Sequence, residues 1–323
     1  MLDSFRDSCG ALWDSDVLSR EGSQTEKIIR NIASIHAILA LEPDLKPRPP
    51  INSLFEELVC LCTQNINHTD VEKILKDPRI TRLLPSLRNL AALAETHLES
   101  HWSRHVIAAE NEAEGHIRLT KFPYYENYVD LTRMELAAIN AVTPSTPQRV
   151  AFIGSGPLPL TSLCMCEALG SSKEEKLLGL KSPEDIVIVN IDHNHNAISQ
   201  STALCKRLGQ RACGMYFICQ DAESLEVELS SCDVVYLAAL VGASQREKED
   251  ALVSIVERMQ PGSLLVIRTA HSLRTLLYPE FDATTNAVLA CLDICMVVHP
   301  YHHVVNSVII GRVKARGKRD IPF

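Results

Sequence analysis

A glycine pair at a sharp turn is one feature of the sequence whose residue types and spacing could do chemistry. The short apolar run Val150 to Ile153 ends at Gly154-Ser155-Gly156-Pro157, and apolar residues then continue at helical spacing. This pattern predicts a buried strand that turns directly into a helix, with glycines that tolerate a positive φ and a close backbone approach. Free N–H groups at such a helix start can bind the anionic end of a ligand. An ordinary strand–helix turn would give the same pattern.

The turn also restricts the class of ligand. Pro159 stands where the dinucleotide-binding fingerprint has its third glycine, which argues against a pyrophosphate. A nucleoside without phosphates that carries a small polar tail fits better, and S-adenosylmethionine is the obvious compound of that class. We therefore expect Gly154, Ser155, Gly156 and Pro157 to contact it.

Two glutamates and three histidines share one predicted helix. Glu95 and Glu99 are four residues apart and lie on one face, while His97, His101 and His105 form an adjacent stripe. A solvated helix face is one interpretation. A metal bound to the histidines is another, but a stripe without flanking carboxylate or thiolate ligands is seldom a metal site. We predict no metal ligands.

Three tyrosines crowd around one proline shortly after this helix. Tyr124, Tyr125 and Tyr128 are conspicuous in a chain with only 5% aromatic residues, and the last two would share a helix face. Such a cluster can simply brace a domain interface. Buried phenols can also hydrogen-bond a ligand carboxylate or relay a proton. On that interpretation Tyr124 would bind substrate, and Tyr125 and Tyr128 would assist catalysis.

Polar residues end three of the predicted strands in the second half of the chain. Asp192 ends the second strand, where doubly wound folds place an acid that accepts hydrogen bonds from ribose hydroxyls. Asp221-Ala222 ends the third, and an acid there meets the adenine amino group in adenosylmethionine enzymes, by analogy. Arg268 ends the fifth, and its fork suits a substrate carboxylate. A salt bridge across the top of the sheet is the alternative for Arg268.

The elements that must position these residues fall into two groups. Helices are predicted from Ser23 or Thr25 onward, over about 51–64, from Thr69 to Pro78, and from near Pro85 to beyond Ile107. Strands are predicted at 150–153, 185–192, 215–222, 233–242 and 263–271, followed by an antiparallel pair at 291–298 and 304–310.

The predicted fold class is therefore α/β. An N-terminal all-helical domain is expected at 24–146, and a Rossmann-like doubly wound S-adenosylmethionine-binding sheet domain at 147–312. Residues 1–23 are expected to be a disordered tail, and residues 313–323 a basic tail.

Composition restricts the partners. Hydrophobic residues make up 46% and charged residues 22% of the 323-residue chain, as in soluble globular proteins. The formal net charge of −8 disfavours nucleic acid, and no apolar run approaches the ~20 residues of a membrane span. Eleven cysteines without a Cys-x-x-Cys pair or a secretory leader indicate free thiols in a reducing compartment, the cytoplasm. These features neither predict nor exclude a homo-oligomer.

Five segments together resemble the nicotianamine synthase family. They span about residues 85–310 and comprise the His97-Leu98-Glu99 helix, the Phe122–Tyr128 cluster, the Gly154–Thr161 turn, the Tyr236–Gly242 segment, and Arg268–His271 with the later Asn306–Ile309. The resemblance implies a synthase that condenses three molecules of S-adenosylmethionine. Each transfers its 3-amino-3-carboxypropyl group and leaves methylthioadenosine, and the last step closes an azetidine ring. The product is a metal chelator, so the protein itself need not hold a metal.

The resemblance also implies site residues. Leu237 and Ala238 would lie at the cofactor, His271 at the substrate, and one glutamate of the long helix would face the reaction chamber. A sulfonium is already a good leaving group, so the enzyme must chiefly orient and deprotonate the attacking amine. A carboxylate in a closed chamber has a raised pKa and suits that work. Glu99, helped by Tyr128 or Tyr125, is the expected base, and Glu95 is the alternative.

Two other functions stay open. An S-adenosylmethionine-dependent methyltransferase differs only in which sulfur–carbon bond faces the nucleophile. A non-catalytic protein that binds an adenosine ligand would use the same turn and release no product.

Overall fold

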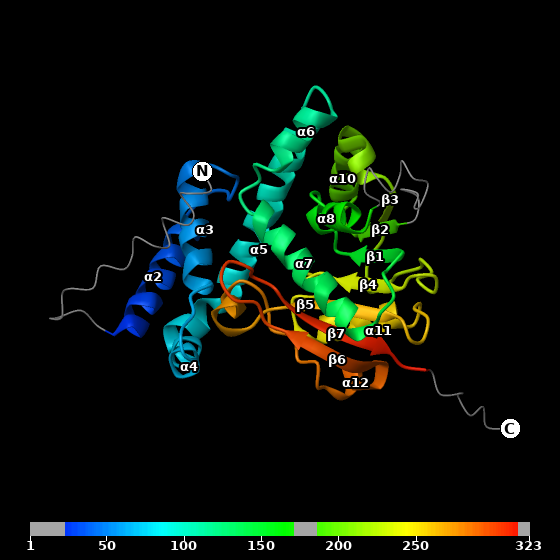
Figure 1. Ribbon diagram of the computed structural model, residues 1–323. Helices are drawn as coiled ribbons and strands as arrows, with labels where there is room; N and C mark the ends of the chain where they lie inside the picture. Colours follow the sequence, from blue (N-terminus) through cyan, green and yellow to red (C-terminus); the bar gives the residue numbers. More distant parts are fainter. Residues whose placement is uncertain (1–22, 171–185, 316–323) are drawn as a thin grey trace.

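The computed structural model describes residues 23–170 and 186–315 (Figure 1). The expected N-terminal tail lies outside these residues apart from Ser23, and so does the expected basic tail apart from residues 313–315. Within the described ranges, no helix combines the length and the apolar character that crossing a membrane requires.

Six helices precede the first strand of the described chain. They are α2 (Gln24–Leu39), α3 (Pro49–Cys62), α4 (His68–Lys76), α5 (Pro78–Ile107), α6 (Glu112–Leu119) and α7 (Tyr125–Val142). In α2 the isoleucines at 28, 29, 32 and 35 are buried, as their three- and four-residue spacing predicts. Figure 1 shows α2, α3 and α4 at one end of the molecule, with α5 and α7 between them and the sheet.

The long helix α5 begins seven residues earlier than the sequence predicted. The predicted start near Pro85 is wrong, because Pro85 lies inside the helix and the chain starts α5 at Pro78. Asp77 caps this start by accepting a hydrogen bond from the backbone N–H of Arg79 at 2.8 Å. Proline is tolerated at the first helical position because its missing N–H would have no partner there. The short helix α6 was not predicted.

A seven-stranded sheet forms the second half of the chain. Its strands are β1 (Arg149–Ile153), β2 (Val187–Asp192), β3 (Met215–Cys219), β4 (Val234–Leu237), β5 (Leu264–Thr269), β6 (Leu292–Val298) and β7 (Ser307–Val313), in the order β3-β2-β1-β4-β5-β7-β6. The first five pair in parallel, and β7 runs antiparallel to both β5 and β6. This confirms the predicted α/β, Rossmann-like class. The strand order reverses between β1 and β4, where such sheets bind ligands.

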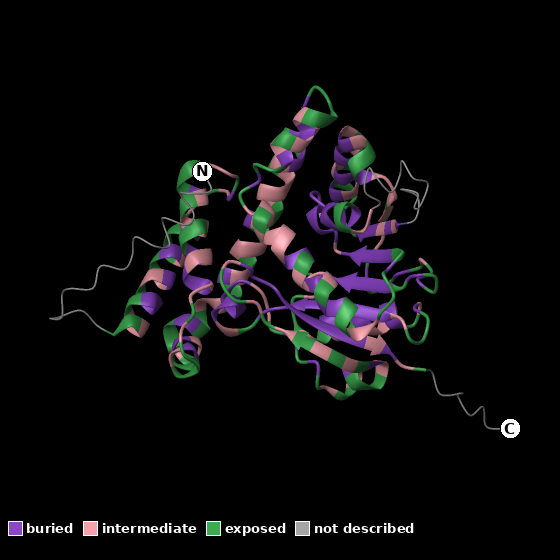
Figure 2. Ribbon diagram, viewed as in Figure 1, coloured by how far each residue is buried: buried purple, intermediate pink, exposed green. Residues whose placement is uncertain are grey.

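Helices cover both faces of this sheet. On one face Leu252 and Ile255 of α11 (Gln245–Val256), with Val288 of α12 (Asn286–Cys291), belong to the same apolar cluster as alternate strand residues. On the other face Leu131 and Ile139 of α7 pack against the sheet. In the described part of the chain, α8 (Leu160–Leu169) follows β1 and α10 (His195–Leu208) follows β2. Figure 2 shows β1, β4 and β5 as buried strands between these layers.

The core of the helical part is completed by residues from the far end of the chain. Leu273 and Leu276 of the 3₁₀ helix η3 (Ser272–Leu276), together with Leu277 and Val305, pack among the apolar residues of α2, α3, α4 and α5. The segments that follow β5 and precede β7 therefore join the helices to the sheet.

Candidate active site

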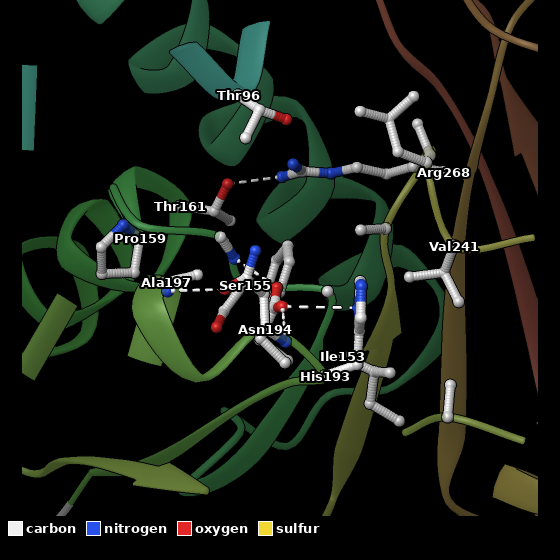
Figure 3. Close-up of a pocket in the computed structure, with 18 of the residues that line it drawn as sticks. Thr96, Ile153, Ser155, Pro159, Thr161, His193, Asn194, Ala197, Val241 and Arg268 are labelled. Carbon is white, nitrogen blue, oxygen red and sulfur yellow. Dashed lines mark hydrogen bonds and ion pairs between the residues drawn. The ribbon is translucent and has the colours of Figure 1, made fainter. Parts of the chain in front are cut away.

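A cavity of about 370 Å³ opens at the carboxyl ends of the parallel strands, beside the β1–β4 reversal. Its sheet side is formed by residues 152–162, 192–194, 220–223 and 238–243, and its helical side by Glu95, Thr96, Glu99 and Tyr128. Figure 3 shows Ser155, His193 and Asn194 on the sheet side, with Thr96 of α5 opposite them. The cavity therefore lies between the helices and the sheet.

The two glycines of the turn are required by what lies next to them. Gly154 has φ +81°, and a Cβ there would come within 2.5 Å of the Val241 side chain. Gly156 has φ +66°, and its Cβ would lie 2.7 Å from Oε2 of Glu99. Because real Cβ atoms do not approach other atoms so closely, a side chain at Gly154 would displace Val241, and one at Gly156 would displace the Glu99 carboxyl.

Asp192 holds the turn from the neighbouring strand. One of its carboxylate oxygens accepts the backbone N–H of Gly156 at 2.9 Å, and the other accepts that of Asn194 at 2.9 Å. The N–H of Gly156 is therefore already paired. Each carboxylate oxygen can accept more than one hydrogen bond, so Asp192 keeps capacity for a ligand hydroxyl. Asp221, Ala222 and Ala238 also line the cavity, so the structure brings these predicted residues together with the turn.

The two glutamates of α5 face the cavity, each with a phenol partner. The Tyr128 hydroxyl donates to Oε1 of Glu99 at 3.2 Å, and the Tyr278 hydroxyl donates to Oε2 of Glu95 at 2.7 Å. Both carboxyls are only partly exposed and line the cavity, so they do not lie on an open surface of the helix. Burial, followed by the nearby Glu95 carboxyl, raises the pKa of Glu99 well above its usual value. Burial also raises the pKa of Glu95, and the hydrogen bond from Tyr278 opposes that shift.

The guanidinium group of Arg268 donates hydrogen bonds to other side chains of the protein. Its Nε and Nη2 donate to the two carboxylate oxygens of Glu135 on α7 at 2.8 and 3.0 Å, and Nη2 also donates to the Thr161 hydroxyl at 2.7 Å (Figure 3). All of these groups are buried. Burial alone would lower the pKa of Arg268, but Glu135 more than offsets it and the pKa is raised. The expectation that the fork binds a substrate carboxylate is therefore corrected: the salt bridge is formed, although Arg268 still borders the cavity.

Three predicted site residues lie away from the cavity. Leu237 is fully buried in the sheet core at the end of β4, and the next residue, Ala238, lines the cavity in its place. Tyr125 packs in the apolar cluster near α8 rather than beside Glu99. His271 stacks on His299 with ring centroids 4.0 Å apart, and its side chain is 48% exposed. The structure therefore does not bring these three residues together with the turn, and their assignments stay predictions.

A smaller cavity of about 100 Å³ lies on the helical side of the same carboxyls. It is bounded largely by apolar side chains of α3 and α5 and by the Phe122–Tyr124 segment. Tyr124 borders this second cavity and not the first, and burial raises its pKa. The residues common to both cavities are Glu95, Glu99, Tyr128, Tyr278 and Asn306, so the two carboxyls lie where the cavities meet.

Sequence reasoning missed several residues that shape this site. Tyr278 follows η3 in a segment that carried no chemical signal of its own. Glu135 did carry a signal, because it lies on the apolar stripe formed with Leu131 and Ile139 of α7, where a charge needs a partner.

A buried lysine was also missed. Lys248 donates from Nζ to the backbone carbonyls of Ala238 and Ala239, each at 2.9 Å, and so fixes the loop after β4. Burial lowers its pKa to about 7. Within residues 23–170 and 186–315, no three His, Cys, Asp or Glu side chains are grouped so that they could hold a metal ion.

The chain is similar to proteins of one known family. The model of the family described as "Nicotianamine synthase protein" matches residues 21–317. The chain is 33% identical over 305 residues to nicotianamine synthase 9 of Hordeum vulgare, covering 93% of this chain and 84% of that protein. It is 32% identical over 292 residues to nicotianamine synthase 3 of Arabidopsis thaliana, covering 90% and 85%.

A solved structure shares the fold. The crystal structure of MtNAS in complex with MTA and tNA superposes with a TM-score of 0.71 at 19% identity, covering 92% of this chain and 100% of that one. A point variant of MtNAS in complex with S-adenosylmethionine gives a TM-score of 0.69 at the same identity and coverage.

Proposed function

This chain belongs to the nicotianamine synthase family, and from that premise we propose which of its residues carry out the reaction. The reaction condenses three S-adenosylmethionine molecules by 3-amino-3-carboxypropyl transfer with azetidine ring closure, and it releases three methylthioadenosine. S-adenosylmethionine is the substrate, and the nicotianamine formed is a metal chelator.

The nucleoside half of S-adenosylmethionine is proposed to lie on the sheet side of the larger cavity. Asp192 is placed for the ribose hydroxyls and Asp221 for the adenine, with the Gly154–Gly156 turn between them. The cavity lining is strongly acidic: its carboxyls are Glu95, Glu99, Asp192, Asp221, Glu223 and Glu247, against the single guanidinium of Arg268 among the described residues. Such a surface attracts a sulfonium and an ammonium group.

Glu99 is proposed to be the base. It takes a proton from the attacking ammonium, and the freed amine attacks the carbon next to the sulfonium. The new nitrogen–carbon bond forms as the carbon–sulfur bond breaks. The electron pair of the broken bond stays on the sulfur, which becomes the neutral thioether of methylthioadenosine. Tyr128 orients the carboxyl through its hydrogen bond to Oε1. The positive charges of the bound substrates favour the ionised carboxylate, which the empty cavity disfavours.

One observation carries this assignment. A glutamate with a phenol partner lies against the glycine turn, so a base from the helices and a nucleoside site from the sheet meet at one point. Held there, an amine and the sulfonium carbon would be positioned for in-line transfer. Glu95, which Tyr278 holds in the same way, is the second candidate for the base.

The experiment incubates the purified full chain with S-adenosylmethionine alone and identifies the nucleoside product by mass. Methylthioadenosine is the expected product. S-adenosylhomocysteine in its place would mean a methyltransferase, and binding without any product would mean an adenosine-ligand protein.

Finer features are also proposed. Within the described ranges, Cys62 and the cysteines that follow it are free thiols, which supports a cytoplasmic enzyme. We infer a helical domain at 24–146 and a sheet domain at 147–312. Assembly into homo-oligomers and the absence of a nucleic-acid partner stay predictions.

A further inference from the structure

Asn306 carries a buried amide that the fold does not use. The residue is only 8% exposed, and its amide nitrogen is enclosed without a hydrogen-bond partner among the described residues. It borders both cavities. A buried amide without a partner destabilises the folded state, because it has given up its hydrogen bonds to water. Such a group is therefore a candidate for binding a ligand.

The backbone around Asn306 is held firmly on both sides. The N–H of Val305 donates to Oδ1 of Asn127 on α7 at 3.2 Å. On the other side, Ser307 begins β7, pairs with Thr269 of β5, and contacts Nδ1 of His299 through its hydroxyl at 2.9 Å. The unpaired amide therefore belongs to a fixed position and not to a loose loop. A half-turn of the amide exchanges its nitrogen and oxygen, so either can face the junction of the cavities.

Of the five described residues that border both cavities, the Asn306 amide is the side-chain donor left without a partner. The hydroxyls of Tyr128 and Tyr278 donate to Glu99 and Glu95. Arg268 borders the larger cavity alone, and its Nε and Nη2 donate to Glu135. Every aminocarboxypropyl group that passes through this site carries an α-carboxylate, which requires a hydrogen-bond donor.

We propose that the Asn306 amide donates to the α-carboxylate of an aminocarboxypropyl group at the junction of the two cavities, an inference that rests on the proposed function. The carboxylate belongs either to the donor S-adenosylmethionine or to the acceptor amine. An uncharged amide suits this place because a lysine or arginine would pair with Glu95 and Glu99 and depress the pKa values that a base needs.

The test replaces Asn306 by leucine, which has a similar volume and no donor. Asn190 is the matched control, because it is a fully buried asparagine whose amide is paired with the Ser162 hydroxyl at 2.6 Å and the Tyr216 carbonyl at 3.4 Å. We expect Asn306→Leu to keep or raise Tm, and Asn190→Leu to lower it. If Asn306→Leu does not fold, Asn306→Ala carries the same comparison.

Steady-state kinetics then separates the two sources of the carboxylate. If it belongs to the donor, Asn306→Leu raises KM for S-adenosylmethionine by roughly 10- to 100-fold, while the inhibition constant of methylthioadenosine, which has no carboxylate, is unchanged. If it belongs to the acceptor of a later transfer, that KM holds and products of a single transfer are released early. Unchanged kinetics would overturn the proposal, and so would an equal loss of affinity for both nucleosides. The wild-type product assay fails separately if the proposed function itself is wrong.

Discussion

Gly156 and Glu99 touch across the boundary between the sheet and the helices: a Cβ on Gly156 would lie 2.7 Å from Oε2 of Glu99. The turn that is proposed to bind the nucleoside therefore also limits where the Glu99 carboxyl can lie. This contact couples the two halves of the proposed reaction, and it makes Gly156 a sensitive position.

Gly156→Ala should reduce turnover far more than stability. The added methyl group displaces the Glu99 carboxyl and also strains a backbone with φ +66°. Gly262→Ala is the matched control, since Gly262 has φ +92° and nothing within 4 Å of its Cβ position. Both variants should lose about 1–2 kcal/mol of unfolding free energy to backbone strain, and only Gly156→Ala should lose activity. Full activity in Gly156→Ala would contradict the placement of Glu99.

Glu99→Gln should lower turnover by ~100-fold or more, because glutamine keeps the shape and cannot accept the proton. Affinity for S-adenosylmethionine should hardly change. Glu95→Gln, measured beside it, tests the alternative base one helical turn away. If both variants retain near-normal turnover, the base is neither glutamate of α5.

In the ligand-free protein, the Glu95 and Glu99 carboxyls should make the folded state less stable as pH rises. Burial raises the pKa of Glu99 well above the ordinary 4.5, and that of Glu95 in the same direction. Between the ordinary and raised values the folded state binds more protons than the unfolded state, so this contribution is complete below about pH 4.5 and disappears as pH rises through the raised pKa. Calorimetry from pH 4.5 to about pH 8 should show that the Tm of the double variant Glu95→Gln/Glu99→Gln rises relative to that of wild type as pH increases.

The control for this pH series is Glu72→Gln. Glu72 is exposed and its Lys76 partner lowers its pKa, so this variant should not gain on wild type with rising pH. Parallel plots of Tm against pH for wild type and the double variant would mean that Glu95 and Glu99 have ordinary pKa values in the folded protein.

Glu135→Gln should destabilise the fold strongly. It leaves the Arg268 guanidinium buried without its carboxylate, and breaking such a buried pair costs about 3–5 kcal/mol. Urea unfolding measures the loss. The exposed pair Glu72–Lys76 provides the comparison, and its removal should leave the midpoint almost unchanged. A small effect of Glu135→Gln would mean that Arg268 finds another partner, such as the Thr161 hydroxyl alone.

The fold class followed from local patterns. The three- and four-residue spacing of isoleucines predicted α2, and the apolar run before two glycines predicted β1 and the turn, because periodicity and backbone permissiveness are properties of short segments. The start of α5 did not follow. This helix contains two prolines: Pro78 is its first residue, and Pro85 lies in its interior. The sequence alone does not tell which of them marks the start of the helix.

The sequence by itself determined that Glu95 and Glu99 share a helix face, that Asp192 ends a strand and that Asp221 closely follows one. Only the tertiary structure decided what those residues meet. Tyr278 lies 183 residues after its partner Glu95, and Glu135 lies 133 residues before its partner Arg268. Spacing along one element fixes the direction of a side chain on that element, whereas its partners and its burial depend on which other elements pack against it. The packing of the elements therefore sets the pKa of Glu99 and the partner of Arg268, and it places His271 outside the larger cavity.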